Sequence, residues 1–291
     1  MKRSVSTLLE QYLVSLRAKM KRFIGLPVNM LYPDYSPLYP FFSIPLNNIG
    51  DPFVESRYEI NSRKMELEVL QYFAELYHIS DYWGYITHGG SEGNLCGLYI
   101  GREVLGKNAA VFYSQDTHYS MYKNARILRI PHIVVRSQNN GSMDYGDLEH
   151  KLQLHSHRDP IIVANMPSTM KGAHDSIEDI IAVLKKLHIT HHYIHVDAAL
   201  GGMIFPFIKN APIFDFRLPI GSIAVSGHKM FGCPIPCGII MSHRCNVVKI
   251  GKTIEYVGAL DTTISGSRNG HTPLLLWYLL QERKDKFNFL M

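Results

Sequence analysis

The chain has 291 residues, of which 46% are hydrophobic and 19% are charged, and its formal net charge is +5. A chain of this length can bury a full core, as one large domain or two small ones. The basic residues are scattered, with the densest group at Lys19, Lys21 and Arg22. Composition therefore gives no case for a nucleic-acid partner, and no apolar run approaches the ~20 residues that span a bilayer.

The first predicted element is an amphipathic helix at the N-terminus. Apolar residues recur there at helical spacing: Val5, Leu8, Leu9, Leu13 and Leu16. The segment is basic, as targeting peptides are, but Glu10 interrupts it and it lacks the cleavage site of a secretory signal. We expect a structural helix, with a transit peptide as the alternative. Residues 23–57 are rich in Pro, Tyr and Asn and are expected to be mostly irregular.

From residue 62 onward, helical and strand patterns alternate. Helices are predicted at 64–79 and 176–189, and short β-rich runs stand at 109–114, 132–137, 160–165, 193–199, 222–227 and 237–242. This alternation predicts an α/β fold with three layers, α/β/α, around a mainly parallel sheet. We expect an N-terminal helix and irregular segment at 1–55, a large domain at 56–245 and an incomplete small domain at 246–291.

The cysteines indicate the cellular compartment. Cys96, Cys233, Cys237 and Cys245 do not resemble a disulfide framework in a chain of this size, so we expect a reducing, cytoplasmic location. Cys233 and Cys237 form a single C-x-x-x-C pair with prolines between them and no second pair. No metal site is therefore predicted.

Polar residues follow several predicted strands, where ligands bind in sheets of this kind. The stretch "THGGSEGN" (87–94) precedes a helix, and its glycines and Ser91 suit an anion such as phosphate, with a plain tight turn as the alternative. His118 follows the strand at 109–114 and could face a ligand, although a surface or core role is the alternative for any one of 15 histidines.

Two more clusters complete this pattern. Asp197 ends the run "YIHVD", and a carboxylate is seldom buried unless it is paired, with a helix N-cap as the alternative role. His191 and His195 lie four apart on a strand, so they do not share a face and are not predicted as metal ligands. Lys229 stands in "SGHKMFGCPIP" (226–236), where a strand gives way to a Gly/Pro-rich turn.

Together, these clusters match the requirements of one cofactor, pyridoxal 5′-phosphate. Its aldehyde reacts with a lysine amine, its pyridine nitrogen needs a carboxylate to remain protonated, and its phosphate needs N–H and hydroxyl donors. The sequence therefore predicts that Lys229 is the residue that binds this cofactor covalently.

The same residues resemble a known family, the pyridoxal-phosphate-dependent group II amino-acid decarboxylases of fold type I. The resemblance is greatest to the branch of bacterial histidine decarboxylases and plant serine decarboxylases. It rests on "NNIGDPF" (47–53), "WGYITHGGSEGN" (83–94), "DTHYS" (116–120), "HVDAALGGM" (195–203), "SGHKMFGCPIPCG" (226–238) and "GSRNGHTPL" (266–274).

The resemblance implies roles for individual residues. Lys229 would carry the cofactor, Asp197 would pair with the pyridine nitrogen and His118 would stack on the ring. The other implied cofactor-binding residues are Gly90, Ser91, Glu92 (through nearby backbone groups), Thr169, Ala199, Ser226 and His228. Tyr256 would transfer a proton, with simple packing as the alternative. Arg268 would contact the substrate carboxylate or the dimer partner, with a surface salt bridge as the alternative.

The resemblance also implies a reaction and a partner. An L-amino acid would be converted to its amine and CO₂ by a homodimer with active sites at the subunit interface. L-Histidine is the favoured substrate, L-serine is the second and a bulkier aromatic amino acid the third. The other hypotheses are an inactive, C-terminally shortened homologue that binds the cofactor, and another fold type I enzyme such as an aminotransferase or a retro-aldol lyase.

The chain departs from the family pattern in three places. Pro167 and Ser168 stand in "NMPSTM" (165–170), where the family usually has glycine and threonine, so this loop is expected to hold cofactor or substrate differently. His88 and Ser91 replace the usual asparagine and threonine in the first cluster. The family also carries a further C-terminal domain after the helix that begins at "TPLLLWYLL" (272–280), so we expect a shortened chain.

Overall fold

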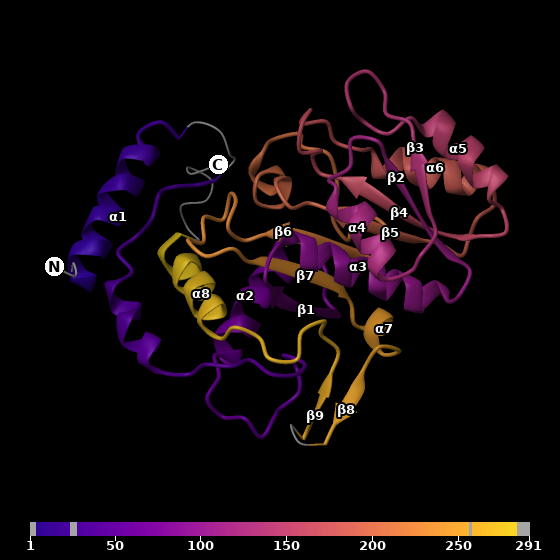
Figure 1. Cartoon of the computed structure of the whole chain (residues 1–291). Coiled ribbons are helices and arrows are strands. Elements are labelled where there is room, and N and C mark those ends of the chain that lie inside the picture. The colour runs from indigo at the N-terminus through magenta and orange to yellow at the C-terminus, as the bar shows by residue number, and fades with distance from the viewer. Residues whose placement is uncertain (1–3, 24–27, 256–257, 284–291) are drawn as a thin grey trace.

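A seven-stranded sheet organises the computed structural model, which describes residues 4–23, 28–255 and 258–283 (Figure 1). Its strands are β1 (Tyr82–Thr87), β7 (Gly238–His243), β6 (Ser222–Ser226), β5 (Tyr193–Asp197), β4 (Asp159–Asn165), β2 (Ala109–Ser114) and β3 (His132–Val135), in that spatial order. The pairs from β6 to β3 are parallel, and β7 runs antiparallel to both of its neighbours. The predicted α/β fold with a mainly parallel sheet is therefore confirmed.

The remaining elements are helices and one small ribbon. The α-helices are α1 (Val5–Met20), α2 (Arg63–Leu76), α3 (Gly90–Leu105), α4 (Ser120–Ile127), α5 (Tyr145–Leu154), α6 (Ile177–Lys186), α7 (Arg244–Val247) and α8 (His271–Arg283). Short 3₁₀ helices are η1 (Ser36–Ser43), η2 (Gly201–Met203) and η3 (Phe205–Phe207). The strands β8 (Lys252–Ile254) and β9 (Ala259–Asp261) form a separate two-stranded sheet.

Each face of the large sheet buries its own apolar core, as three-layer packing requires. Along β4, Ile162 belongs to one core while Ile161 and Val163 belong to the other, because successive strand side chains point to opposite faces. Helices α2, α5, α6 and α8 cover the first face, and α3 and α4 cover the second. The core is thus a central sheet between two helical layers.

Strand β1 is the one strand of the large sheet that was not predicted. Its sequence, "YWGYIT", contains a glycine among aromatic residues and so lacks a clear alternating pattern. Gly84 is required by packing, since a Cβ there would lie 2.4 Å from the Ile240 carbonyl oxygen of β7. The strand therefore depends on a close tertiary approach that a single sequence does not reveal.

The predicted N-terminal helix is confirmed as α1, which Ser4 caps by accepting a hydrogen bond from the Thr7 N–H at 3.1 Å. None of its residues is buried, and it lies apart from the central sheet (Figure 1). Its exposed apolar residues include Leu9 and Tyr12. Among the described residues, no helix has the length and apolarity needed to cross a bilayer.

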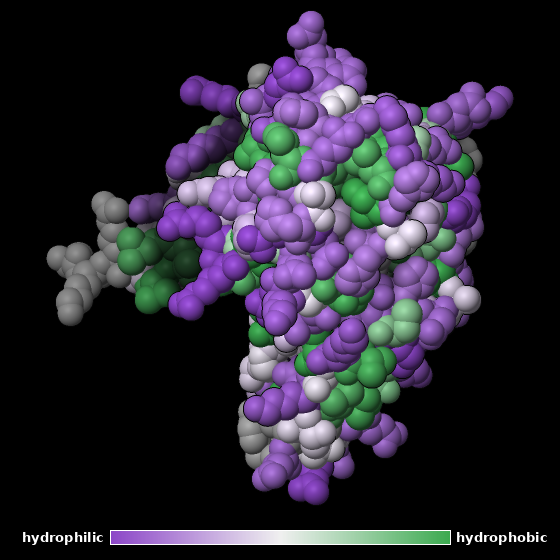
Figure 2. Space-filling model, turned by 90° about the vertical axis from the view of Figure 1, so that its right-hand side faces the viewer, coloured by the Kyte–Doolittle hydropathy of each residue, from purple (hydrophilic) through white to green (hydrophobic). Residues whose placement is uncertain are grey.

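The surface on the side of the molecule opposite α1 exposes fewer apolar side chains together. Around β3, α5 and α6 the face is mainly hydrophilic, with separate smaller apolar patches (Figure 2). Exposed apolar side chains on this side include Val134 and Leu154. Scattered apolar residues of this kind are normal on protein surfaces.

Candidate active site

A cavity of about 460 Å³ lies where β4, β5 and β6 end and α3 begins. The carboxyl ends of parallel strands meet at one edge of a sheet, so residues distant in sequence converge there. Its lining comprises His88, Gly89, Gly90, Ser91, Glu92, Asn94, His118, Tyr119, Asn165, Pro167, Ser168, Thr169, Asp197, Ala199, Leu200, Ser226, His228 and Lys229.

Lys229 follows β6 and reaches this cavity. Burial lowers the pKa of its amine below the ordinary value of 10.5, while the nearby negative charge of Asp197 acts in the opposite direction. The Lys229 carbonyl accepts a hydrogen bond from the Asn29 N–H at 3.0 Å, which fixes the backbone. A lowered pKa increases the neutral fraction of the amine, and only the neutral amine is nucleophilic.

Asp197 is 6% exposed at the end of β5 and is held by two donors. The Asn94 side-chain amide donates to Oδ2 at 2.8 Å, and the Ala199 N–H donates to Oδ1 at 3.1 Å. These bonds compensate the cost of burying a carboxylate. Asp197 therefore presents a positioned acceptor to the cavity.

Asn94 is itself fixed by a buried histidine. His195 Nε2 donates to Asn94 Oδ1 at 3.0 Å, and His195 Nδ1 accepts from the Ser222 hydroxyl at 2.8 Å. His195 is fully buried, and burial lowers its pKa to about 3. The neutral imidazole thus belongs to a chain of hydrogen bonds that ends on Asp197.

The turn into α3 forms a cradle for an anion. A Cβ at Gly90 would lie 2.7 Å from Ser226 Oγ and 3.3 Å from Ala199 Cβ, so only glycine leaves this space open. The Ser91 carbonyl accepts from the Asn124 amide at 3.0 Å, which ties the turn to α4. Free N–H groups at a helix start attract negative charge.

Two further groups bear on whether the cavity suits pyridoxal phosphate. His118 Nδ1 lies 2.8 Å from Ser120 Oγ, and burial is the main cause that lowers the His118 pKa. Ser168 Oγ is buried without a hydrogen-bond partner among the described residues, in the loop that also brings Pro167 and Thr169 to the cavity. An amine, a carboxylate, an anion cradle and an unused hydroxyl fit the chemistry of this cofactor.

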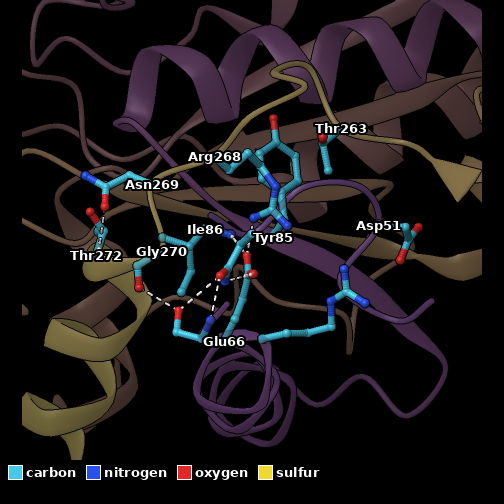
Figure 3. Close-up of polar contacts among 12 residues, drawn as sticks. Asp51, Glu66, Tyr85, Ile86, Thr263, Arg268, Asn269, Gly270 and Thr272 are labelled. Carbon is cyan, nitrogen blue, oxygen red and sulfur yellow. Dashed lines mark hydrogen bonds and ion pairs between the residues drawn. The ribbon is translucent and has the colours of Figure 1, made fainter. Parts of the chain in front are cut away.

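Arg268 is not among the described residues that line this cavity, and it lies beside Glu66 and Tyr85 (Figure 3). Its predicted contact with the substrate carboxylate or the dimer partner stays a prediction. Arg268 is 3% exposed and forms an ion pair with Glu66 of α2, which is fully buried. Arg268 also donates to the Gly50 carbonyl at 3.0 Å, and its guanidinium lies 5.3 Å from the centre of the Tyr85 ring. The alternative of a surface salt bridge is wrong, because this pair is buried.

The other predicted residues lie as follows. Lys229, His118, Asp197, Gly90, Ser91, Glu92, Thr169, Ala199, Ser226 and His228 all line the cavity. Tyr256 lies outside the described residues. The cavity is also lined by three residues for which no role was predicted: Asn94, Asn165 and Tyr119. Asn94 stands one turn into α3 in "GSEGN", and its place beside two glycines is the only local signal that could have marked it.

Because His195 is buried, we expect the free energy of unfolding to depend on pH. The pKa of His195 is about 3 in the folded chain and near 6.5 when unfolded, so the unfolded state binds more protons between these values. We expect the His195 contribution to the free energy of unfolding to fall by about 1.4 kcal/mol for each pH unit below 6.5. Urea titrations at several pH values will measure the slope for the wild type and His195→Gln.

The comparison of slopes removes the contribution of other titrating groups. His195→Gln keeps a hydrogen-bonding side chain but cannot titrate in this range, so its slope is expected to be shallower. Equal slopes for the two proteins contradict the assignment of a neutral, buried imidazole.

Comparison with known proteins shows the relationships of this chain. The pyridoxal-dependent decarboxylase conserved domain matches residues 49–265. The chain is 43% identical over 288 residues to serine decarboxylase 2 of Oryza sativa subsp. japonica, covering 98% of this chain and 61% of that protein. It is 45% identical over 261 residues to a histidine decarboxylase of Mesorhizobium japonicum, covering 89% of this chain and 70% of that protein.

Solved structures agree with this relationship. L-Methionine decarboxylase from a Streptomyces species superposes with a TM-score of 0.86 and 25% identity, covering 97% of this chain and 75% of that one. The chain thus spans 61% of the rice relative and 70% of the bacterial one. The extent of the domain match and the identity to these relatives lead to one conclusion. This chain belongs to the pyridoxal-dependent decarboxylase family.

Proposed function

We propose that this protein binds pyridoxal phosphate and decarboxylates an L-amino acid to its amine and CO₂. The observation that carries the proposal is that Lys229, Asp197 and the start of α3 line one cavity. Relatives at 43% and 45% identity are decarboxylases, which supports the same reaction.

In the proposed reaction, each group has a separate task. When bound, pyridoxal phosphate supplies an electron-accepting ring that stabilises the negative charge left at Cα as CO₂ leaves. Lys229 would bind the cofactor aldehyde through its amine. Asp197, held by Asn94 and the Ala199 N–H, would keep a proton on the pyridine nitrogen.

The remaining groups bind and orient. The Gly90 turn, Ser91 and Ser226 would hold the phosphate through N–H and hydroxyl donors. His118 would pack on the ring face, and its lowered pKa favours a neutral imidazole there. Tyr256, outside the described residues, is proposed to return a proton to Cα.

For the substrate, we propose L-histidine first and L-serine second. Histidine decarboxylases of Mesorhizobium japonicum and Solanum lycopersicum are 45% and 44% identical to this chain, which supports the first choice. Serine decarboxylase 2 of rice, at 43%, supports the second. The two sets of relatives are almost equally similar, so a direct assay must decide between them.

We also propose that the protein is a homodimer in a reducing, cytoplasmic compartment. Helix α1 exposes apolar side chains including Leu9 and Tyr12, and a second subunit would bury them. The four cysteines are free thiols, which is consistent with reducing conditions.

The experiment that tests the function starts from purified protein mixed with pyridoxal phosphate. We expect a visible absorption band and, after borohydride reduction, a mass increase on the peptide that contains Lys229. Addition of L-histidine or L-serine is then expected to release CO₂ and form histamine or ethanolamine. A band without CO₂ release from any amino acid would favour the inactive homologue, and a keto acid product would favour an aminotransferase.

A further inference from the structure

The cavity also holds a carboxylate–imidazole pair that the proposed reaction does not use. His88 lies in the turn after β1, Glu92 lies four residues later in the first turn of α3, and both line the cavity. His88 Nδ1 lies 2.7 Å from Glu92 Oε2, and the His88 backbone N–H donates to the same oxygen at 2.8 Å. One carboxylate therefore holds His88 through both its ring and its backbone.

This contact determines the tautomer of His88. A carboxylate accepts hydrogen bonds, so the Nδ1 atom that faces Glu92 carries the proton. In the neutral ring, Nε2 is then a hydrogen-bond acceptor. None of the described residues occupies Nε2 with a hydrogen bond. His88 thus has one nitrogen held by the protein and one available to a ligand.

Glu92 is anchored from the side of the buried core. Its Oε1 atom accepts from the Tyr85 hydroxyl at 3.0 Å and from the Ser265 hydroxyl at 3.4 Å. Tyr85 lies beside the guanidinium of Arg268, which is itself paired with Glu66 (Figure 3). The carboxylate is 13% exposed, so it forms a fixed support for the imidazole.

The His88 side chain is 55% exposed, which places it at the open part of the cavity. Lys229, where a substrate would react, is more buried than this. Asp197 and Asn94 occupy the buried end of the cavity. A substrate bound at Lys229 would therefore direct its side chain toward the open end. The residues at the open end would therefore contact the substrate side chain and distinguish one amino acid from another.

We propose that His88 is a specificity-determining residue that selects amino acids whose side chain ends in a hydroxyl or N–H donor. Nε2 would accept this hydrogen bond, and the Glu92 contact keeps the acceptor in place. A thioether has no such donor, so methionine would gain nothing from His88. This inference rests on the proposed function, because it assumes that an amino acid reacts at Lys229.

The test measures binding and turnover in the full chain loaded with pyridoxal phosphate. Calorimetric titrations with the methyl esters of L-histidine, L-serine and L-methionine compare wild type, His88→Leu and His88→Asn. We expect His88→Leu to weaken binding of the histidine or serine ester about tenfold, the value of one hydrogen bond, and to leave the methionine ester unchanged. His88→Asn keeps a carbonyl acceptor and is expected to recover part of the loss.

A matched control and a direct readout accompany these titrations. His150→Asn changes an exposed histidine on α5 that does not line the cavity, and no ester is expected to bind differently. Nitrogen-15 NMR of labelled histidine, with His88→Asn identifying the signal, is expected to show a protonated Nδ1 and a bare Nε2. The opposite tautomer overturns the proposal, even if His88→Leu fails to fold.

The remaining outcomes separate the two proposals. Equal weakening of all three esters, or a loss of pyridoxal phosphate affinity alone, overturns the specificity role and assigns His88 to the cofactor site. A wild-type protein that discriminates among the esters through His88 but releases no CO₂ supports this inference and contradicts the proposed decarboxylation. We expect His88→Leu to lower kcat/KM for histidine or serine by raising KM, with little change in kcat, because the lost hydrogen bond acts on substrate binding.

Discussion

Lys229→Ala is expected to lose the covalent attachment of pyridoxal phosphate and to lower the decarboxylation rate about 10³-fold or more. Lys229 lines the cavity beside Asp197, and burial lowers its pKa toward the neutral form that attacks an aldehyde. Alanine removes the amine and leaves the anion cradle at Gly90 intact. The measurements are CO₂ release and the mass of borohydride-reduced protein.

A matched lysine shows whether the effect is specific. Lys185→Ala changes an exposed residue on α6, outside the cavity, and is expected to keep wild-type rates. Circular dichroism should show the same fold for both variants. Retained turnover or retained attachment in Lys229→Ala would contradict the assignment of the reactive amine.

Arg268→Met is expected to destabilise the folded chain by about 3–5 kcal/mol, because it leaves the carboxylate of Glu66 buried without its charged partner. Glu66 is fully buried and also accepts from the Ile86 N–H at 2.9 Å (Figure 3). Its other oxygen accepts from the Asn48 amide at 2.7 Å. Those neutral donors cannot replace a guanidinium. The free energy of unfolding from urea titration measures the effect.

Two comparisons control this experiment. Lys186→Met breaks an exposed pair with Glu149 at 2.8 Å, and it is expected to cost only about 0–1 kcal/mol. Arg268→Met combined with Glu66→Gln removes both charges and is expected to cost less than the sum of the single changes. If Arg268→Met lowers the free energy of unfolding as little as Lys186→Met does, the buried pair contributes little to stability.

Much of the cavity was predictable because its residues follow strands directly. Asp197 ends β5, Lys229 follows β6, and His118 follows β2. In a parallel sheet these positions share one edge, so order along the chain was enough to place them together. The β-branched runs that mark most of the strands are local in sequence and were read correctly for the same reason.

Other features depend on contacts between distant residues, which no local pattern carries. Arg268 stands in "GSRNG", a polar, glycine-rich stretch of the kind usually found at the surface. Its partner Glu66 is 202 residues away in sequence, and the pair is buried only because α2 packs against the segment before α8. Asn94 and His195 hold each other in place by a hydrogen bond between residues 101 positions apart. Strand β1 needs Ile240 of β7 to approach Gly84.

The sequence by itself determined the fold class through its local periodicity and the cofactor chemistry through its strand-end residues, and the family followed from motifs that resemble the decarboxylases. The tertiary structure decided which polar side chains pair in the interior. It placed Arg268 in the interior beside Glu66, and it joined Ser222, His195 and Asn94 behind Asp197. The physical reason is that a buried charge or amide must find its partner in space, and the partner is supplied by whichever element packs against it.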